Sequence, residues 1–153
     1  MKAVKYQKFS EINPSDLLSM LNRTKVRKHL IDHPLFTVDT LNTWMDAKIA
    51  VDSIPGCRIR AIVFEGTLAG WCGIQLEYEK YELAIVIDDQ FWGLGKAVFQ
   101  DMMKWAKELG HKEVFIHFLH TRPGYRFLDK IAKSVHKTNM HGDNFTTYQL
   151  EVK

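Results

Sequence analysis

The spacing of apolar and polar residues in the first third of the chain predicts one short strand followed by two helices. Residues 3–9 fit the strand. Asn13 and Pro14 then combine a capping side chain with a proline suited to the first helical position, and this helix is expected to reach about Leu30. The second helix is predicted over residues 38–53, where large apolar residues recur at helical spacing.

The middle of the chain changes to a strand pattern. Residues 58–64 and 68–77 are expected to form a hairpin, because a turn containing a glycine at 65–67 separates them. A third strand is predicted over residues 81–87. Its last five residues are apolar without a break, which favours a central strand covered on both faces of the sheet.

The last third of the chain alternates between helices and strands. After a glycine-containing turn, a helix is predicted to about Leu109, then a strand over 113–119, a helix over 124–135 and a strand over 145–152. Three antiparallel strands that lead into such a crossover imply a mixed sheet. The expected fold class is therefore α/β: a mixed sheet of about six to seven strands with helices on both faces.

Composition is consistent with one folded domain covering residues 1–153, since about 100 to 200 residues is usual for a domain. With 46% hydrophobic and 25% charged residues, the chain is unlike disordered, collagenous or disulfide-scaffold proteins. The net charge of +3 is compatible with an anionic cofactor. It is too small an excess to indicate a nucleic-acid partner.

The N-terminal residues are too charged for a secretory signal, and no stretch approaches the roughly 20 apolar residues of a membrane span. A cytoplasmic location without membrane association is therefore expected. Cys57 and Cys72 form no CxxC pair, so they are interpreted as buried apolar residues. No metal-ligand set is assigned.

The junction between the third strand and the following helix carries the most chemical information. Glycines at 93 and 95 are expected to leave main-chain N–H groups uncovered in a sharp turn, at the positive end of a helix dipole. Such a turn suits a diphosphate, and Lys96 adds a solvated cation. Replacing Gly95 with a bulky residue is therefore expected to weaken ligand binding more than Lys96→Ala.

Two common nucleotide-binding motifs do not fit this junction. A phosphate-binding loop of the GxxxxGK[ST] type would need Gly at Gln90 and Ser or Thr at Ala97. A dinucleotide-binding GxGxxG fingerprint would need a third Gly at Val98. A purely structural role for the two glycines, in turning a strand into a helix, stays open.

The apolar strand, this turn and the long following helix resemble motif A of the GNAT superfamily of N-acetyltransferases, which reads Gln/Arg-x-x-Gly-x-Gly/Ala. Gln90, Gly93 and Gly95 match one frame of the motif. Trp92, Gly95 and Ala97 match a second frame with better spacing from the strand. The order of elements and Gly70, after the hairpin, are also similar to the family.

The resemblance implies transfer of an acetyl group from acetyl-CoA to an amine acceptor, by direct attack in a ternary complex. The diphosphate would lie on residues 92–97, and the pantetheine between the strands 81–87 and 113–119. The acceptor class stays open between a small amine, an antibiotic, a protein N-terminus and a lysine, and a homodimer is compatible with the resemblance. The cofactor-binding residues that it implies are Ile85, Ile87, Trp92, Gly93, Leu94, Gly95, Lys96, Ala97 and Thr121.

The sequence departs from the family pattern after the predicted strand over residues 113–119. Leu128 stands where the family often has a tyrosine that protonates the leaving thiolate. Tyr125 lies three residues earlier and would offer a hydroxyl from a neighbouring position, or would pack against the sheet edge. Thr121 replaces an asparagine and keeps one hydrogen-bonding group.

Candidate general bases are carboxylates and imidazoles near the strand ends. Glu77 and Glu82 would act through water, whereas His117 and His120 titrate near neutral pH. Each has an alternative interpretation as an exposed hairpin charge or a hydrogen-bonded core or rim side chain. The acceptor is expected to contact the first two helices and the loop at residues 33–36.

Two rival functions remain. A non-catalytic acyl-CoA-binding or regulatory protein is suggested by Leu128 at the acid position. An RNA-binding module would use the basic residues at 23–29, but no aromatic residues are interleaved with those charges, which disfavours it.

Overall fold

The computed structural model describes residues 3–28, 30, 33–121 and 126–153. In this part of the chain, seven strands form one sheet in the order β1-β2-β3-β4-β5-β7-β6. The strands are β1 (Val4–Gln7), β2 (Arg58–Phe64), β3 (Thr67–Glu77), β4 (Lys80–Ile87), β5 (Glu113–Leu119), β6 (Ser134–Met140) and β7 (Asp143–Glu151). The helices are η1 (Phe9–Glu11), α1 (Pro14–Leu21), α2 (Thr24–Arg27), α3 (Val38–Asp52), η2 (Asp89–Leu94), α4 (Gly95–Glu108) and α5 (Arg126–Ile131).

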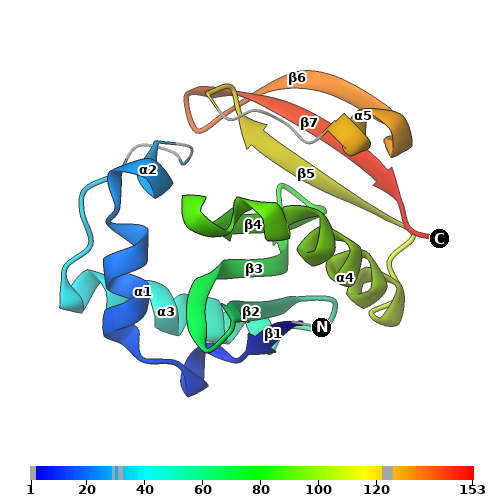
Figure 1. Cartoon of the computed structure of the whole chain (residues 1–153). Coiled ribbons are helices and arrows are strands. Elements are labelled where there is room, and N and C mark those ends of the chain that lie inside the picture. The colour runs from blue at the N-terminus through cyan, green and yellow to red at the C-terminus, as the bar shows by residue number, and fades with distance from the viewer. Residues whose placement is uncertain (1–2, 29, 31–32, 122–125) are drawn as a thin grey trace.

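The predicted mixed sheet is confirmed, with helices on both faces (Figure 1). All neighbouring strands pair antiparallel except β4 and β5, which are parallel. The predicted hairpin between β2 and β3 turns at Glu65 and Gly66, both at positive φ. The helices α1, α2 and α3 cover one face of the sheet, whereas α4 and α5 cover the other.

The first predicted helix is wrong in length, because the chain leaves helical geometry after Leu21. Asn13 caps α1 as expected, by accepting a hydrogen bond from the Ser15 amide at 3.0 Å. The side chain of Asn22 instead exchanges two hydrogen bonds, of 2.9 and 2.8 Å, with the backbone of Phe36. This side-chain pairing ties the end of α1 to the loop at Phe36, and a separate short helix, α2, follows.

The predicted helix over 124–135 is also wrong at its end. Among the described residues of this range, the helix covers Arg126–Ile131. Ser134 then begins strand β6, which the sequence analysis missed. Strand β6 forms a hairpin with β7 through His141 and Gly142, whose φ values are 53° and 80°. A two-residue turn with positive φ at both positions is a common hairpin connection, but His-Gly is not one of the residue pairs that usually mark it in a sequence.

Strands β4 and β5 pair over only two positions before they separate. Glu82 lies opposite Phe115 and Leu83 opposite Ile116, and no later residue of β4 pairs with β5 among the described residues. Figure 1 shows β5, with β7 beside it, turning away from the strands β1 to β4. The predicted opening between these two strands is therefore present.

Close packing between β3 and β4 supports the carboxyl end of β4. A Cβ on Gly70 would lie 2.0 Å from the Val86 carbonyl oxygen, so only glycine fits this position. No helix in the described part of the chain combines the length and the apolar character that crossing a membrane requires.

Candidate active site

A cavity of about 620 Å³ lies on the face of the sheet that α1 and α3 cover. It extends over β3, β4 and β5 at the place where β4 and β5 separate. Most of its lining is apolar. The large apolar and aromatic residues around it include Leu30, Phe36, Trp44, Trp71, Phe118 and Phe145.

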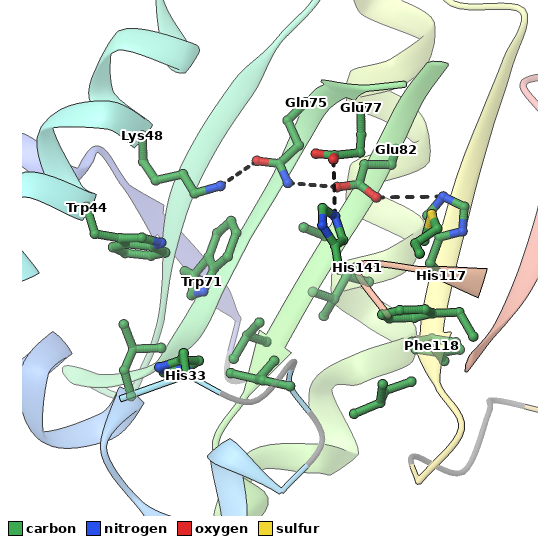
Figure 2. Close-up of a pocket in the computed structure, with 18 of the residues that line it drawn as sticks. His33, Trp44, Lys48, Trp71, Gln75, Glu77, Glu82, His117, Phe118 and His141 are labelled. Carbon is green, nitrogen blue, oxygen red and sulfur yellow. Dashed lines mark hydrogen bonds and ion pairs between the residues drawn. The ribbon is translucent and has the colours of Figure 1, made fainter. Parts of the chain in front are cut away.

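A chain of polar side chains crosses one wall of this cavity (Figure 2). Lys48 Nζ donates to Gln75 Oε1 at 2.7 Å, and Gln75 Nε2 donates to Glu82 Oε1 at 2.8 Å. The other carboxylate oxygen of Glu82 lies 3.7 Å from His117 Nε2. His117 Nδ1 and Thr147 Oγ1 are 2.7 Å apart, which orients the imidazole ring.

Strand register explains why these side chains meet. Gln75 lies directly opposite Glu82 in the antiparallel pair of β3 and β4. His117 lies opposite Thr147 in the pair of β5 and β7. Side chains at directly opposed positions share a face of the sheet, so both pairs follow from the pairing itself. Lys48 completes the chain from α3, which packs across this face.

Burial shifts the pKa values of three groups in this wall. Desolvation raises the pKa of Glu82 above its ordinary value, which makes its carboxylate a stronger base. Desolvation lowers the pKa of Lys48, against the opposing effect of the carboxylates of Glu82 and Glu77. Desolvation also lowers the pKa of His117 to about 4, so His117 is neutral at pH 7 and its contact with Glu82 is not an ion pair.

A second acid and imidazole pair lies at the rim of the cavity. Glu77 Oε1 and His141 Nε2 are 3.4 Å apart, and both side chains are more exposed than Glu82 and His117. His141 comes from the turn between β6 and β7 that the sequence analysis did not identify. Figure 2 shows His141 projecting toward Glu77 and Glu82.

The loop at residues 33–36 lines the cavity. The two hydrogen bonds from Asn22 hold Phe36 in place. The rings of Phe36 and Trp44 lie 5.9 Å apart, and those of Trp44 and Trp71 lie 5.4 Å apart at 78°. A row of aromatic side chains thus connects this loop to strand β3 of the sheet.

The glycine-containing segment differs from the sharp, uncovered turn that the sequence predicted. Residues Asp89–Leu94 form two short 3₁₀ pieces that meet in a kink at Phe91, whose φ of −119° and ψ of 15° are not helical. The Gly95 amide donates to the Trp92 carbonyl. The Gly95 amide is therefore already engaged by the protein. Gly93 is open, since a Cβ there would meet no atom within 4 Å. In the first turn of α4, the amides of Lys96 and Ala97 have no intrahelical acceptor.

Two ion pairs connect this segment to the helices on the cavity side. Asp88 is 2% exposed and pairs with Arg23, and it also accepts a hydrogen bond from the Gln90 amide. Lys25 pairs with Asp89 at 3.5 Å. The Ile87 carbonyl at the end of β4 accepts a hydrogen bond from the Trp92 indole at 3.0 Å. Neighbouring segments thus hold the end of β4.

The remaining predicted site residues are scattered. His120 is exposed, lies 3.3 Å from the Asn144 carbonyl oxygen through Nδ1, and does not line the cavity. Thr121 donates to the Lys28 carbonyl at 3.1 Å.

Leu128 is fully buried in the core with residues of α4. Tyr125 lies outside the described residues. Ile85 lines the cavity on β4, and Ile87 ends that strand.

Sequence reasoning missed several of the cavity residues, although a weak signal for them exists. Trp44 and Lys48 are four residues apart on a helix, which places them on one face. Trp71, Gln75 and Glu77 occupy alternate positions of one strand and therefore one face of the sheet. The pattern of polar residues on the inner face of β3 was the available indication of a site.

No protein-family model matches the sequence, and no curated protein matches it either. Solved structures, in contrast, match over nearly the whole chain. An N-acetyltransferase from Staphylococcus aureus is 14% identical, with 100% of this chain and 99% of that chain covered and a TM-score of 0.70. A GNAT-family acetyltransferase from Streptococcus pneumoniae is also 14% identical, with 100% of each chain covered and a TM-score of 0.68.

A third similar structure is an acetyltransferase from Salmonella typhimurium that modifies the N-terminal serine of the ribosomal protein L7/L12. It is 13% identical, with 98% of this chain and 94% of that chain covered and a TM-score of 0.72. The chain therefore has the fold of the GNAT acetyltransferases. At these identities, the likeness concerns the arrangement of the backbone.

Proposed function

We propose that this protein is an N-acetyltransferase that moves an acetyl group from acetyl-CoA to an amine acceptor by direct attack in a ternary complex. The observation that carries the proposal is the separation of β4 and β5 after Leu83, over a cavity of about 620 Å³ with Glu82 and His117 in its wall. The GNAT fold supports it, because the similar solved structures are acetyltransferases.

The separated strands offer a site for the pantetheine arm of acetyl-CoA. Strands β4 and β5 pair at Glu82 and Leu83, and beyond these positions the described parts of the two strands lie apart. The pantetheine arm would lie in this opening, with Ile85 and Ile87 of β4 beside it.

The diphosphate of acetyl-CoA would lie on residues 92–97. Open space at Gly93 and the first-turn amides of Lys96 and Ala97 suit an anion at the positive end of α4. The engaged amide of Gly95 reduces the number of donors relative to the sequence-based expectation. The Lys96 ammonium, 5.6 Å from the ring centre of Phe127, adds a positive charge beside this segment.

Glu82 is the proposed general base. An aliphatic amine is protonated near pH 7 and must lose a proton before it can attack a thioester. The pKa of Glu82 is raised by desolvation, so this carboxylate accepts a proton more readily than an exposed glutamate. The Gln75 amide, which donates to Glu82 at 2.8 Å, orients the carboxylate, and the neutral His117 lies 3.7 Å from its other oxygen.

The remaining bond changes do not require an acid at position 128, where this chain has a leucine. The amine nitrogen forms a bond to the acetyl carbonyl carbon, and the bond from that carbon to sulfur breaks. A thiolate leaves readily, and water can protonate it afterwards. Leu128 is fully buried and has no proton to donate, so a solvent proton is the consistent source unless the hydroxyl of Tyr125 supplies it.

A leucine at position 128, where the resemblance implies an acid, also motivates a second candidate, a non-catalytic acyl-CoA-binding or regulatory protein. Such a protein would keep the cofactor site and lack turnover. Release of free thiol from acetyl-CoA, measured with small amines, amino acids and peptides with free N-termini, separates the two candidates. Calorimetric titration with acetyl-CoA provides the parallel measure of binding.

Substitution of the proposed base sharpens this experiment. Glu82→Gln should lower kcat about 10²- to 10⁴-fold, the usual contribution of a general base, while acetyl-CoA binding is retained. Glu151→Gln, at an exposed position of β7, is the matched control and should leave kcat unchanged. Tight acetyl-CoA binding without turnover on any acceptor would favour the regulator. Absence of acetyl-CoA binding would contradict both candidates.

A further inference from the structure

Lys48 places a cation in the aromatic part of the cavity without an ion-pair partner. Its ammonium lies 5.7 Å from the ring centre of Trp44 and 5.0 Å from that of Trp71. Its hydrogen bond goes to the neutral amide of Gln75. Among the residues that the structure describes, no carboxylate forms an ion pair with it.

This arrangement leaves Lys48 able to bind an anion. An ammonium has three N–H donors, and one of them is used by Gln75. Burial lowers the pKa of Lys48, against the opposing effect of the Glu82 and Glu77 carboxylates, so an anion beside the ammonium would favour its charged form. A ligand carboxylate in the cavity would supply that compensation, through a charge-assisted hydrogen bond.

The distance between Lys48 and Glu82 selects among ligands. The side-chain amide of Gln75 connects the two by hydrogen bonds of 2.7 and 2.8 Å. With standard bond lengths inside the amide, Lys48 Nζ and Glu82 Oε1 are at most about 8 Å apart. An α-amino acid has its nitrogen and carboxylate oxygen about 3 Å apart, so with one hydrogen bond at each end it spans the same distance.

The rest of the cavity wall suits an apolar side chain. Trp44, Trp71 and Phe36 form one continuous aromatic wall, and Phe118 and Phe145 line the cavity on the side of β5 and β7. The volume of about 620 Å³ lies within the usual range for small-molecule sites, roughly 300 to 1,000 Å³.

We propose that the acceptor is a free α-amino acid with a large apolar side chain, whose carboxylate binds Lys48 and whose amine faces Glu82. This inference rests on the proposed transferase function and specifies its substrate class. A free carboxylate is the decisive group, because the first residue of a protein has its carboxyl carbon in a peptide bond. The inference therefore separates this protein from the similar acetyltransferase that modifies the N-terminal serine of a ribosomal protein.

The test compares three acceptors that differ at one group: L-phenylalanine, L-phenylalanine amide and 2-phenylethylamine. The wild-type protein should show a kcat/KM for L-phenylalanine at least 10-fold above the other two. Lys48→Met keeps the apolar stem and removes the charge. It should lower kcat/KM for L-phenylalanine about 10- to 100-fold, the range of one charge-assisted hydrogen bond, and change that for 2-phenylethylamine less than about 3-fold.

Two further variants serve as controls. Lys104→Met removes an exposed lysine from α4, on the other face of the sheet, and should leave all three kcat/KM values unchanged. Lys48→Arg keeps the positive charge and should retain most of the preference for the carboxylate. The Lys48→Arg result also decides the question if Lys48→Met fails to fold.

A binding measurement separates this inference from the proposed function. N-acetyl-L-phenylalanine and N-acetyl-2-phenylethylamine are titrated calorimetrically in the presence of coenzyme A, so that no turnover is needed. Preference for the carboxylate that disappears in Lys48→Met supports the inference even if no acceptor is acetylated. Acetylation of amines or peptides with no dependence on a free carboxylate or on Lys48 would overturn it and leave the transferase function standing.

Discussion

On the α4 side of the sheet, β4 contributes Leu83, Ile85 and Ile87 to an apolar core, whereas on the α3 side it contributes Glu82, Ala84 and Val86 beside the cavity. Leu83 and Ile85 also reach the cavity where β4 and β5 separate. The two faces belong to the same strand and differ only in whether the residue number in β4 is odd or even. We call the α4 side of the sheet the odd face and the α3 side the even face, after the numbers of these β4 residues and whatever the numbers of residues from other elements. The odd face continues into buried residues of α4 and of α5, including Met102 and Leu128. The even face carries ionisable groups with displaced pKa values.

The difference shows how one strand serves two purposes. Close apolar packing on the odd face stabilises the sheet, and this stabilisation offsets the cost of burying polar groups on the even face. Substitutions on the odd face should therefore change the free energy of unfolding. Substitutions on the even face should mainly change catalysis, binding and pH dependence.

The largest expected effect on stability is on the odd face. Met102 has no exposed surface, and Met102→Ala should reduce the free energy of unfolding by about 2 to 5 kcal/mol, because it creates a cavity in the core. Urea unfolding measures this change. The kcat of the folded protein should stay near the wild-type value, and a loss of less than 1 kcal/mol would contradict the assignment of this face to stability.

The second prediction concerns Leu128, at the position where the resemblance to the GNAT superfamily implies a tyrosine. Leu128→Tyr adds atoms at a site with no exposed surface, so it should destabilise the fold by about 1 to 3 kcal/mol. Thermal unfolding and thiol release are the two measurements. An increase in kcat would show that the position can reach the leaving thiolate, contrary to its placement in the core.

The third prediction is a pH dependence on the even face. Burial lowers the pKa of His117 to about 4, compared with about 6.5 in an unfolded chain, so between these values the unfolded state binds more protons. The contribution of His117 to stability is therefore complete above about pH 6.5 and is lost as the pH falls toward 4. From pH 7.5 to pH 5, this loss is about 2 kcal/mol.

Comparison with His117→Gln isolates this contribution. Glu82 acts in the opposite direction, because its raised pKa favours the folded state at low pH and loses that effect as the pH rises. Urea unfolding at both pH values should show a smaller decrease for His117→Gln than for the wild type. Equal decreases in the two proteins would indicate that His117 titrates normally in the folded state.

The smallest expected effects lie in the η2 and α4 segment. A leucine at Gly93 would fill the open space proposed for the diphosphate, so Gly93→Leu should weaken coenzyme A binding at least 10-fold without a large loss of stability. Lys96→Ala should weaken binding by less than about 1 kcal/mol, because this ammonium is exposed. Isothermal titration calorimetry orders the two variants, and the reverse order would contradict a main-chain site.

Much of the fold could be predicted from the sequence, because its signals are local. The cap at Asn13, the turn at Glu65 and Gly66 and the helix over Val38–Asp52 each depend on residues close together in the chain. Strand β6 could not be predicted in the same way. Its polar residues form a strand because β7 supplies a partner along its whole length.

In the candidate site, too, the features set by neighbouring residues could be predicted and those set by long-range packing could not. The motif around Gly93 is contiguous, so the resemblance to an acetyl-CoA-binding segment was visible, although the engagement of the Gly95 amide was not. Glu82 and His117 were candidate bases on the ground of residue type alone. Their assembly with Lys48 depends on α3, β3, β4 and β5 together, and no local pattern specifies that arrangement.

Apart from β6 and the break between α1 and α2, the order of the main strands and helices was determined by the sequence alone, because nearby residues decide backbone geometry and burial. The same holds for the apolar character of β4 and the glycine-containing junction after it. Tertiary structure decided which side chains of β4 face the cavity and which residues from other elements meet them there. The register of Gln75 against Glu82 and the packing of Lys48 across them arise only when segments distant in the chain pair.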